Sequence, residues 1–172
     1  MAPLPLLLLI SALLGDDAPP AGKLAMTKAV ACSTVTGYGD FVPLDEAVLT
    51  RDDKLLLYYE PSGYAYEQVG REYHVHLIQD ARVRRKGEKT VLQAKDKLLD
   101  YKGKSKTPPL NVFLANTITL KPLPPGEYEL EIILRDAIGK GPPATQILKF
   151  RVKAVDAPKG RPDPPGGEAP GR

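Results

Sequence analysis

The chain has 172 residues, of which 42% are hydrophobic, and its formal net charge is +3. This length favours one domain with extensions, and a charge this small does not by itself point to a nucleic-acid partner. The single cysteine, Cys32, excludes an intrachain disulfide, so packing has to stabilise the fold. We expect Cys32 to be a small buried residue.

The N-terminal stretch MAPLPLLLLISALLG contains an apolar run from Leu4 to Leu14. A run of about 11 residues suits the hydrophobic region of a signal peptide and is too short to span a bilayer. We predict a signal peptide over residues 1–18, with cleavage between Gly15 and Ala21, and therefore a periplasmic or secreted protein. No lysine or arginine precedes the run, which leaves the apolar N-terminus of a cytoplasmic protein as the alternative.

Two strands are predicted before residue 61, in KAVACSTVTGYG (residues 28–39) and KLLLYYE (residues 54–60). The second is apolar on both parities, as expected of a central strand covered on both faces. The following segment, EPSGYAYEQVG, places Tyr64 and Tyr66 in a loop. Exposed tyrosines can stack on sugar rings or anchor a protein partner, so these two are the first candidate binding site. The alternative is that they cover an apolar sheet edge.

EYHVHLIQDARVRR (residues 72–85) has a dominant period of two, which predicts a strand with one face in the core and one in water. The core face carries Tyr73, Val75, Leu77, Ala81 and Val83, and the polar face carries His74, His76, Asp80, Arg82 and Arg84.

His74 and His76 form an H-x-H pair, and residues i and i+2 of a strand project to the same side. Both rings could therefore reach one metal ion, but zinc needs a third ligand, and only Glu72 and Asp80 share this face. Two solvated histidines are the favoured interpretation. We predict no metal site and no cofactor, and keep His74 and His76 as an outside metal candidate.

The segment ARVRRKGEK (residues 81–89) predicts a basic hairpin tip with Gly87 in the turn. Such a tip could contact phosphate, anionic lipid or acidic polysaccharide, although a charged turn also discourages strand pairing. The second candidate binding site is Arg84, Arg85 and Lys86, flanked by Arg82 and Lys89.

After this turn, KTVLQAKD (residues 89–96) predicts a strand, and AKDKLLDYKG (residues 94–103) is a short, ambiguous helix candidate. LNVFLANTITLK (residues 110–121) again alternates, with its apolar residues on one face. That face carries Leu110, Val112, Leu114, Ile118 and Leu120.

GEYELEIILRD (residues 126–136) and TQILKFRVK (residues 145–153) alternate in a way that predicts a hairpin centred near Lys140. Tyr128, just after a Pro-Gly turn, is either a tyrosine corner or an ordinary core tyrosine. A one-residue slip would expose every apolar side chain, so the pattern specifies the register. The expected pairs are Leu130 with Phe150, Tyr128 with Val152, Glu131 with Lys149, Glu129 with Arg151, and Glu127 with Lys153.

Residues 154–172 consist mostly of proline, glycine and charge and predict a disordered tail. The folded part should therefore lie between residues 23 and 153. About seven short strands separated by turns favour an all-β fold, an Ig-like antiparallel β-sandwich.

Four segments, in this order, carry a resemblance: GYGDFVPL, KLLLYYE, EYHVHLIQDARVRRKGEKTV and PPGEYELEIILRD. Together they resemble an uncharacterised family of bacterial exported proteins with a single Ig-like β-sandwich domain. The resemblance implies this fold and an exported location. It implies no active site.

No G-x-S-x-G elbow, P-loop, H-E-x-x-H or paired C-x-x-C is present in the sequence. We therefore predict a non-enzymatic binding or structural module with an unknown protein or polysaccharide partner in the cell envelope. We expect no nucleic-acid partner. We expect contact with a membrane only through the export signal. One alternative is a carbohydrate-binding module using exposed Tyr64 and Tyr66, and another is a weak metal-dependent enzyme using His74 and His76.

Overall fold

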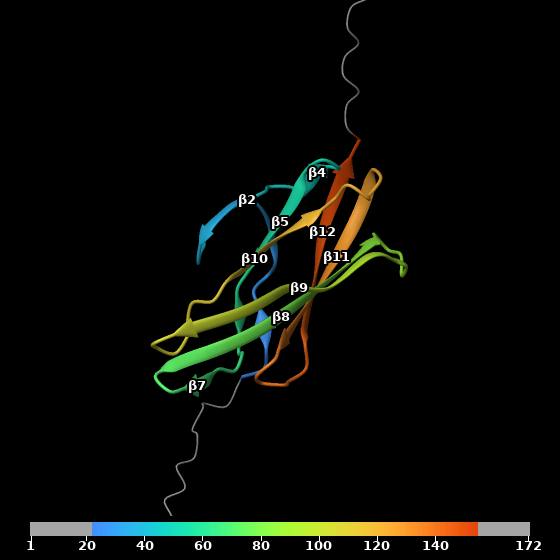
Figure 1. Ribbon diagram of the computed structural model, residues 1–172. Coiled ribbons are helices and arrows are strands. Elements are labelled where there is room, and N and C mark those ends of the chain that lie inside the picture. The colour runs from blue at the N-terminus through green and yellow to red at the C-terminus, as the bar shows by residue number, and fades with distance from the viewer. Residues whose placement is uncertain (1–21, 155–172) are drawn as a thin grey trace, which may run out of the picture.

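The computed structural model describes residues 22–154 (Figure 1). Within them 63% of residues lie in strands and none in a helix, which confirms the all-β class. The predicted signal peptide, residues 1–18, and the predicted tail from residue 155 onward lie outside these residues. The described part contains 12 strands instead of about seven. The additional strands, β1, β3, β4, β6 and β7, are only two to four residues long, too short for alternation to be recognised.

The strands form three sheets. A four-stranded sheet has the order β10-β5-β2-β3, with β2 Val30–Gly37, β3 Asp40–Pro43, β5 Lys54–Tyr59 and β10 Leu114–Thr119. A six-stranded sheet has the order β4-β12-β11-β8-β7, and β9 also pairs with β8; its strands are β4 Val48–Thr50, β7 Glu67–Val69, β8 Glu72–Arg85, β9 Val91–Ser105, β11 Gly126–Asp136 and β12 Ala144–Lys153. The two short strands β1 Ala25–Met26 and β6 Pro61–Ser62 pair with each other.

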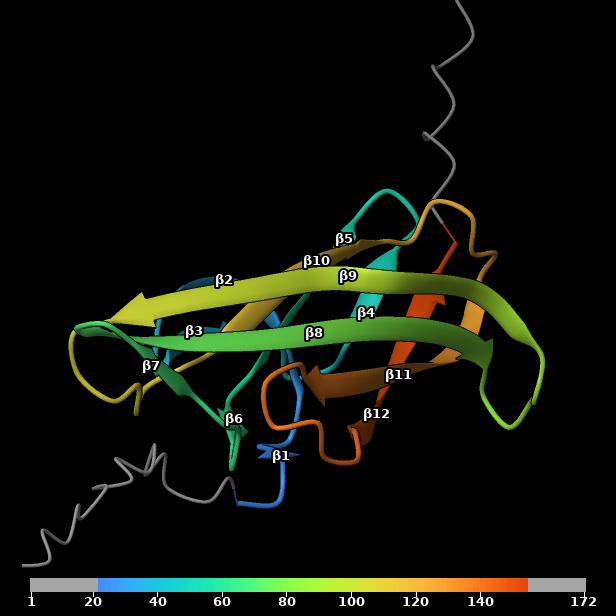
Figure 2. The ribbon, with the colours of Figure 1, turned by 60° about the horizontal axis from the view of Figure 1, so that its bottom comes forward.

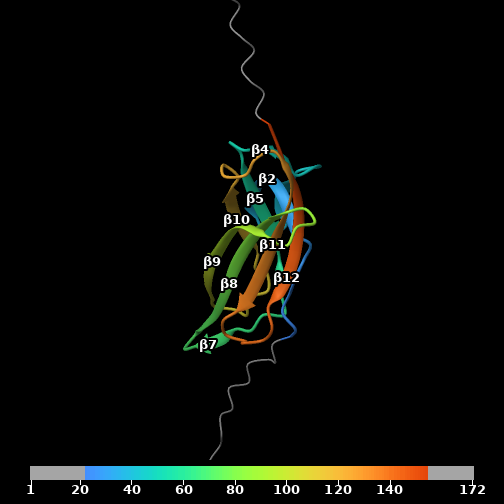
Figure 3. The same ribbon diagram turned by 90° about the vertical axis from the view of Figure 1, so that its right-hand side faces the viewer.

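One hydrophobic core joins the two larger sheets. Figure 3 shows β8, β11 and β12 in front of β2, β5 and β10, and side chains from both layers meet between them. Leu55 and Leu57 of β5 are fully buried, as are Leu77 of β8 and Leu130 of β11. Burying each such side chain contributes about 1.5–3 kcal/mol. This arrangement is consistent with a β-sandwich.

Two predictions about the four-stranded sheet are confirmed. β5 lies between β10 and β2, so it is an inner strand, and its apolar residues are used on both faces. Tyr58, on the face opposite Leu57, is 2% exposed and stacks on Phe41 with ring centroids 4.2 Å apart. Cys32 of β2 is buried, as expected for a small apolar residue.

β8 confirms the predicted alternation, because Val75, Leu77 and Val83 are buried on the core face. Its other face is less exposed to water than predicted. Asp80 on that face is only 8% exposed, and its carboxylate contacts the backbone of Lys97 on β9 and the side chain of Arg135 on β11.

The helix candidate at residues 94–103 is wrong, because β9 continues as a strand along the whole length of β8. The local ambiguity arises from a bulge between the pairs Gln79–Leu99 and Ala81–Lys95, where Lys97 has φ 49°. The extra residues break the period-two pattern, so the sequence loses its strand signature there. Pairing with β8 overrides the local preference.

Leu110 was predicted to lie on the core face and is instead 83% exposed. The strand begins only at Leu114, after Pro108 and Pro109. Because proline has no backbone N–H to donate to a sheet, this segment remains a loop. The other four residues assigned to this face are buried: Val112, Leu114, Ile118 and Leu120.

The β11–β12 hairpin forms with the predicted faces but with a register that differs by two residues. Tyr128 lies opposite Phe150 and Leu130 opposite Leu148, and Glu127 meets Arg151 instead of Lys153. A two-residue shift leaves every side chain on the same face, so alternation cannot distinguish the two registers.

The sheets are not entirely antiparallel. β4 pairs with β12 in parallel, with Arg151 opposite Val48. The chain crosses from the four-stranded to the six-stranded sheet between β3 and β4, and it returns in β5. β4 therefore lies beside β12, and the two strands run in the same direction.

Tyr128 is fully buried, and its hydroxyl donates a hydrogen bond to the carbonyl of Pro124 at 2.5 Å. A tyrosine at the start of a strand that bonds to the backbone a few residues upstream has the geometry of a tyrosine corner. Of the two interpretations of Tyr128, this contact favours the corner.

Candidate functional site

The open end of the β8–β9 hairpin carries tyrosines on its inner face. Tyr73 of β8 lies opposite Ser105, and Tyr101 of β9 lies opposite Leu77, so both rings belong to the core side of the ribbon. Between them and the loop Thr107–Val112 lies a pocket of about 370 Å³. We call it the tyrosine pocket, and it is lined by Tyr73, Val75, Tyr101, Gly103, Lys104, Ser105 and Thr107–Val112.

Gly103 gives Tyr101 its orientation. A Cβ added at Gly103 would lie 2.7 Å from the Tyr101 hydroxyl and 3.0 Å from two ring carbons. The ring therefore lies across the strand in the space that any other residue at position 103 would occupy. The glycine is required here by this close approach and not by an unusual φ.

Tyr64 and Tyr66, the first predicted site, are half-buried and pack against the core. The Tyr64 hydroxyl donates to the carbonyl of Pro109 at 2.8 Å, and the Tyr66 ring meets Tyr73 edge-on, with centroids 5.5 Å apart. Burial, followed by the neighbouring Tyr101, raises the pKa of Tyr64. Both residues therefore support the wall of the tyrosine pocket and do not form an exposed platform.

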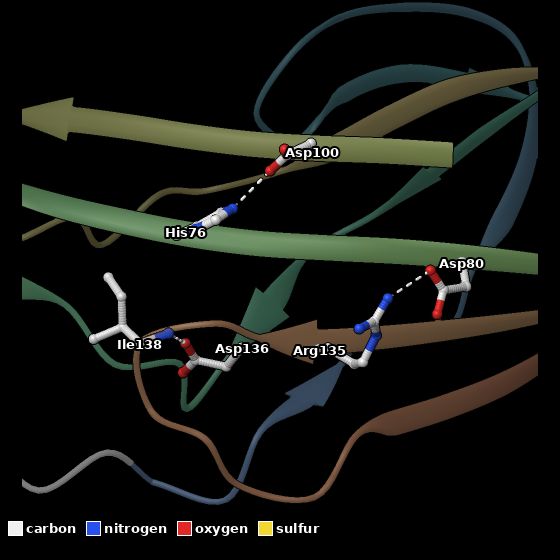
Figure 4. A network of polar contacts seen from close by, with 6 residues as sticks. All are labelled: His76, Asp80, Asp100, Arg135, Asp136 and Ile138. Atoms are coloured by element: carbon white, nitrogen blue, oxygen red, sulfur yellow. Dashed lines mark hydrogen bonds and ion pairs between the residues drawn. The ribbon is translucent and has the colours of Figure 1, made fainter. Parts of the chain in front are cut away.

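Asp136 ties the loop with these tyrosines to the end of β11. One carboxylate oxygen accepts hydrogen bonds from the N–H groups of Ile138 and Gly139, both at 2.9 Å, and the other accepts one from Ala65 at 2.6 Å. Figure 4 shows the contact with Ile138. Ala65 lies between Tyr64 and Tyr66, so Asp136 positions both. Sequence reasoning missed this residue because its partners are 71 positions away or in the adjacent turn.

The second predicted site, at the hairpin tip, is internally paired. Arg84 lies 2.6 Å from Glu131 and Lys86 lies 2.6 Å from Glu127, while the Arg85 guanidinium lies over the Tyr128 ring at 5.7 Å. Hydrogen bonds from Lys86 and then Arg151 lower the pKa of Glu127 to about 2. All three basic side chains therefore have partners on β11, and the partners of Arg84 and Lys86 are carboxylates.

His74 and His76 contact different carboxylates. His76 Nε2 lies 2.6 Å from Asp100 Oδ1, as Figure 4 shows, whereas His74 Nε2 lies 3.6 Å from Glu72 Oε2. The hydrogen bond from His76 lowers the pKa of Asp100. Residues 22–154 contain no group of three or more His, Cys, Asp or Glu side chains that could hold a metal ion.

Asp80 organises the β9 bulge and also contacts Arg135, as Figure 4 shows. Its carboxylate accepts hydrogen bonds from the backbone N–H of Lys97 at 2.8 Å and from Arg135 at 2.7 Å. Burial by itself raises the pKa of Asp80, but these two hydrogen bonds and the charge of Arg135 outweigh it and lower the pKa. Asp80 therefore remains ionised. Its hydrogen bond holds the backbone of Lys97 at φ 49°, in the left-handed region that a lysine rarely adopts.

A second polar group that the sequence did not reveal lies within the core. Gln79 is fully buried, and its Oε1 accepts hydrogen bonds from the Tyr59 hydroxyl at 2.8 Å and from Asn116 at 2.5 Å. The cluster connects β8 with β5 and β10 across the two sheets. Gln79 lies on the core face of β8, as its position in the alternation predicts, but nothing in the local sequence identifies its partners.

Comparisons with protein-family models, with curated proteins and with solved structures gave no match. In the part of the chain that the structure describes, no helix is long and apolar enough to cross a membrane. The predicted family resemblance therefore stays a prediction, and the candidate site rests on the geometry of the tyrosine pocket.

Proposed function

We propose that this chain is an exported, non-enzymatic binding module with an Ig-like β-sandwich fold, and that its tyrosine pocket binds a polysaccharide of the cell envelope. The observation that carries the proposal is the pocket itself, in which aromatic rings lie beside several hydrogen-bonding side chains. Sugar recognition uses this combination, because the rings contact the apolar face of a sugar and the polar groups bond its hydroxyls.

Two tyrosine hydroxyls of the pocket are available to a ligand. Among residues 22–154 the tyrosine hydroxyls that form hydrogen bonds belong to Tyr58, Tyr59, Tyr64 and Tyr128. Tyr73 and Tyr101 are not among them, and Lys104 and Asn111 add further polar groups. The pocket thus combines donors and acceptors with two rings.

The non-enzymatic part of the proposal rests on the partners of the nucleophile and base candidates. Cys32 is buried, and burial raises the pKa of its thiol, which disfavours a reactive thiolate. Nε2 of each histidine faces a carboxylate, at 2.6 Å from Asp100 for His76 and at 3.6 Å from Glu72 for His74. This arrangement supports a structural role for His74 and His76.

Export is supported by the apolar run at Leu4–Leu14, and the Ig-like assignment by the tyrosine corner at Tyr128. Sequencing the N-terminus of the protein recovered from an envelope fraction tests the export. A mature protein that starts between residues 16 and 22 supports it. Recovery of the intact chain from the cytoplasm would contradict it.

Binding is tested by calorimetric titration of the full chain with envelope polysaccharide fractions. We expect Tyr101→Leu to weaken binding at least tenfold, about 1.4 kcal/mol, because it removes both the ring face and the hydroxyl. Ile147→Ala, which shortens an exposed apolar residue on β12, serves as the control and should bind normally. Equal affinity of Tyr101→Leu and the unmodified chain, or no binding to any fraction, would refute the proposal.

A further inference from the structure

A mostly apolar groove of about 590 Å³ lies between one edge of each large sheet. It is lined by Ala81 and Val83 of β8, by Leu92–Lys95 and Leu98 of β9, and by Thr117–Thr119 of β10. We call it the edge groove. Leu92, on its β9 side, is 43% exposed, although it is a large apolar residue.

Both strands that flank the edge groove have an unpaired outer edge. In the described residues β10 pairs only with β5, and β9 pairs only with β8. Figure 3 shows β9 and β10 on the same side of the molecule, and Figure 2 shows β10 crossing behind β9 at an angle. The sandwich is therefore open along this side, and an unpaired edge is a template for an added strand.

The two edges are not equivalent. β9 carries Lys95 and Lys97 and is interrupted by the bulge that Asp80 holds, and such features prevent strand addition. β10, with the sequence LANTIT, has no charged residue and no bulge in its pairing with β5. An added strand can therefore pair with β10, with β9 as the opposite wall of its binding site.

The wall opposite β10 favours an acidic strand. Lys95 is the only charged residue that lines the edge groove, and none of the ion pairs among residues 22–154 involves it. Gln93 Nε2, also in this wall, is a buried donor without a hydrogen-bond partner in the described residues. Both groups call for acceptors such as carboxylates.

We propose that the edge groove binds an extended segment of a partner protein in which every second residue faces the groove, and in which these groove-facing residues are alternately apolar and acidic. The segment pairs antiparallel or parallel with the free edge of β10 and extends the four-stranded sheet. Its groove-facing apolar side chains contact Val83 and Ile118, and its groove-facing carboxylates reach Lys95 and Gln93, because Val83 and Gln93 lie opposite each other on one face of the β8–β9 ribbon. A second copy of this chain fits less well, because its β10 strand offers no acidic side chain to Lys95.

The test uses the full chain and two ten-residue peptides in which every second residue is serine and the remaining residues alternate valine with glutamate or valine with lysine. Binding is measured by titration, and the site is located by backbone amide hydrogen exchange. We expect the valine–glutamate peptide to bind at least tenfold more tightly than the valine–lysine peptide. It should also slow exchange at least tenfold at the β10 amides that point away from β5, because these amides gain strand partners.

Two variants and a control sharpen this test. Lys95→Glu should reverse the preference between the two peptides, whereas Lys149→Glu, a matched charge change on β12, should leave it unchanged. Tyr101→Leu should also leave it unchanged, which separates this site from the tyrosine pocket. The proposal is overturned if neither peptide binds, if Lys95→Glu has no effect, if protection falls outside β9 and β10, or if the chain alone forms dimers through β10.

Discussion

At its turn the β8–β9 hairpin carries Arg84 and Lys86, each 2.6 Å from a glutamate of β11, whereas at its open end Tyr73 and Tyr101 line a pocket. The turn is the more conspicuous region of the sequence, yet Arg84 and Lys86 are already paired with carboxylates of the fold. The open end is inconspicuous, yet it leaves aromatic and polar groups for a ligand. A run of charge along the chain is therefore a weaker guide to a site than side chains that remain without partners after folding.

The largest loss of stability should come from removing the contacts that hold the open end of the β8–β9 hairpin. Asp136→Ala removes the acceptor for three backbone N–H groups, and we expect it to lower the free energy of unfolding by about 2–4 kcal/mol. Urea denaturation measures this loss. Hydrogen exchange should accelerate at Ala65 and Ile138 and remain unchanged at the hairpin tip. Asp52→Ala, at an exposed position, is the control, and an equal loss in both variants would count against this role of Asp136.

A smaller effect is expected at Gly103. Gly103→Ala places a methyl carbon 2.7 Å from the Tyr101 hydroxyl, which is too close, so the ring has to move at a cost of about 1–3 kcal/mol. Thermal unfolding and the affinity for polysaccharide should both decrease. Gly141→Ala, with no atom within 4 Å of the added carbon, should change neither. Unaltered binding by Gly103→Ala would show that the Tyr101 orientation is unimportant.

The ion pairs at the tip of the β8–β9 hairpin should make the stability of the fold depend on pH in acid. The pKa of Glu127 is lowered from its ordinary value of 4.5 to about 2, so its ion pairs stabilise the fold above pH 4.5. This contribution is lost as the pH falls toward 2. The melting temperature should therefore decline over this range. Glu127→Gln should show a shallower decline, because the titrating group is gone. Parallel curves for the two proteins would contradict the assignment.

The smallest effect on stability should come from Leu110. Because its side chain is 83% exposed, Leu110→Ser should change the free energy of unfolding by less than about 0.5 kcal/mol. Its place in the lining of the tyrosine pocket nevertheless predicts weaker polysaccharide binding. A variant with normal stability and normal binding would place the ligand away from this loop.

Predictions from the sequence succeeded where burial on one face repeats every second residue. The buried faces of β8 and β11 are examples, since Leu77, Leu130 and Ile132 are where alternation predicted them. The register of the last hairpin was missed by two residues because both registers bury the same side chains. The β9 bulge was missed because it depends on Asp80 of a neighbouring strand.

The candidate site was predictable only in part. Tyr64 and Tyr66 were recognised as unusual loop residues, and they do lie beside the pocket, but as supports. Tyr101 lies in residues 94–103, a segment whose sequence is ambiguous between helix and strand. The sequence therefore could not predict which face of a strand Tyr101 occupies. Its contact with Gly103 and its position near Tyr73 exist only after β8 and β9 pair.

The amino-acid order alone determined that the chain forms strands and which side of each long strand is buried, because those properties follow from side-chain spacing within one segment. The tertiary structure decided which charges are neutralised, which tyrosines face a pocket and which strand edges stay unpaired. These depend on which residues of distant segments become neighbours, and local periodicity carries no information about such contacts.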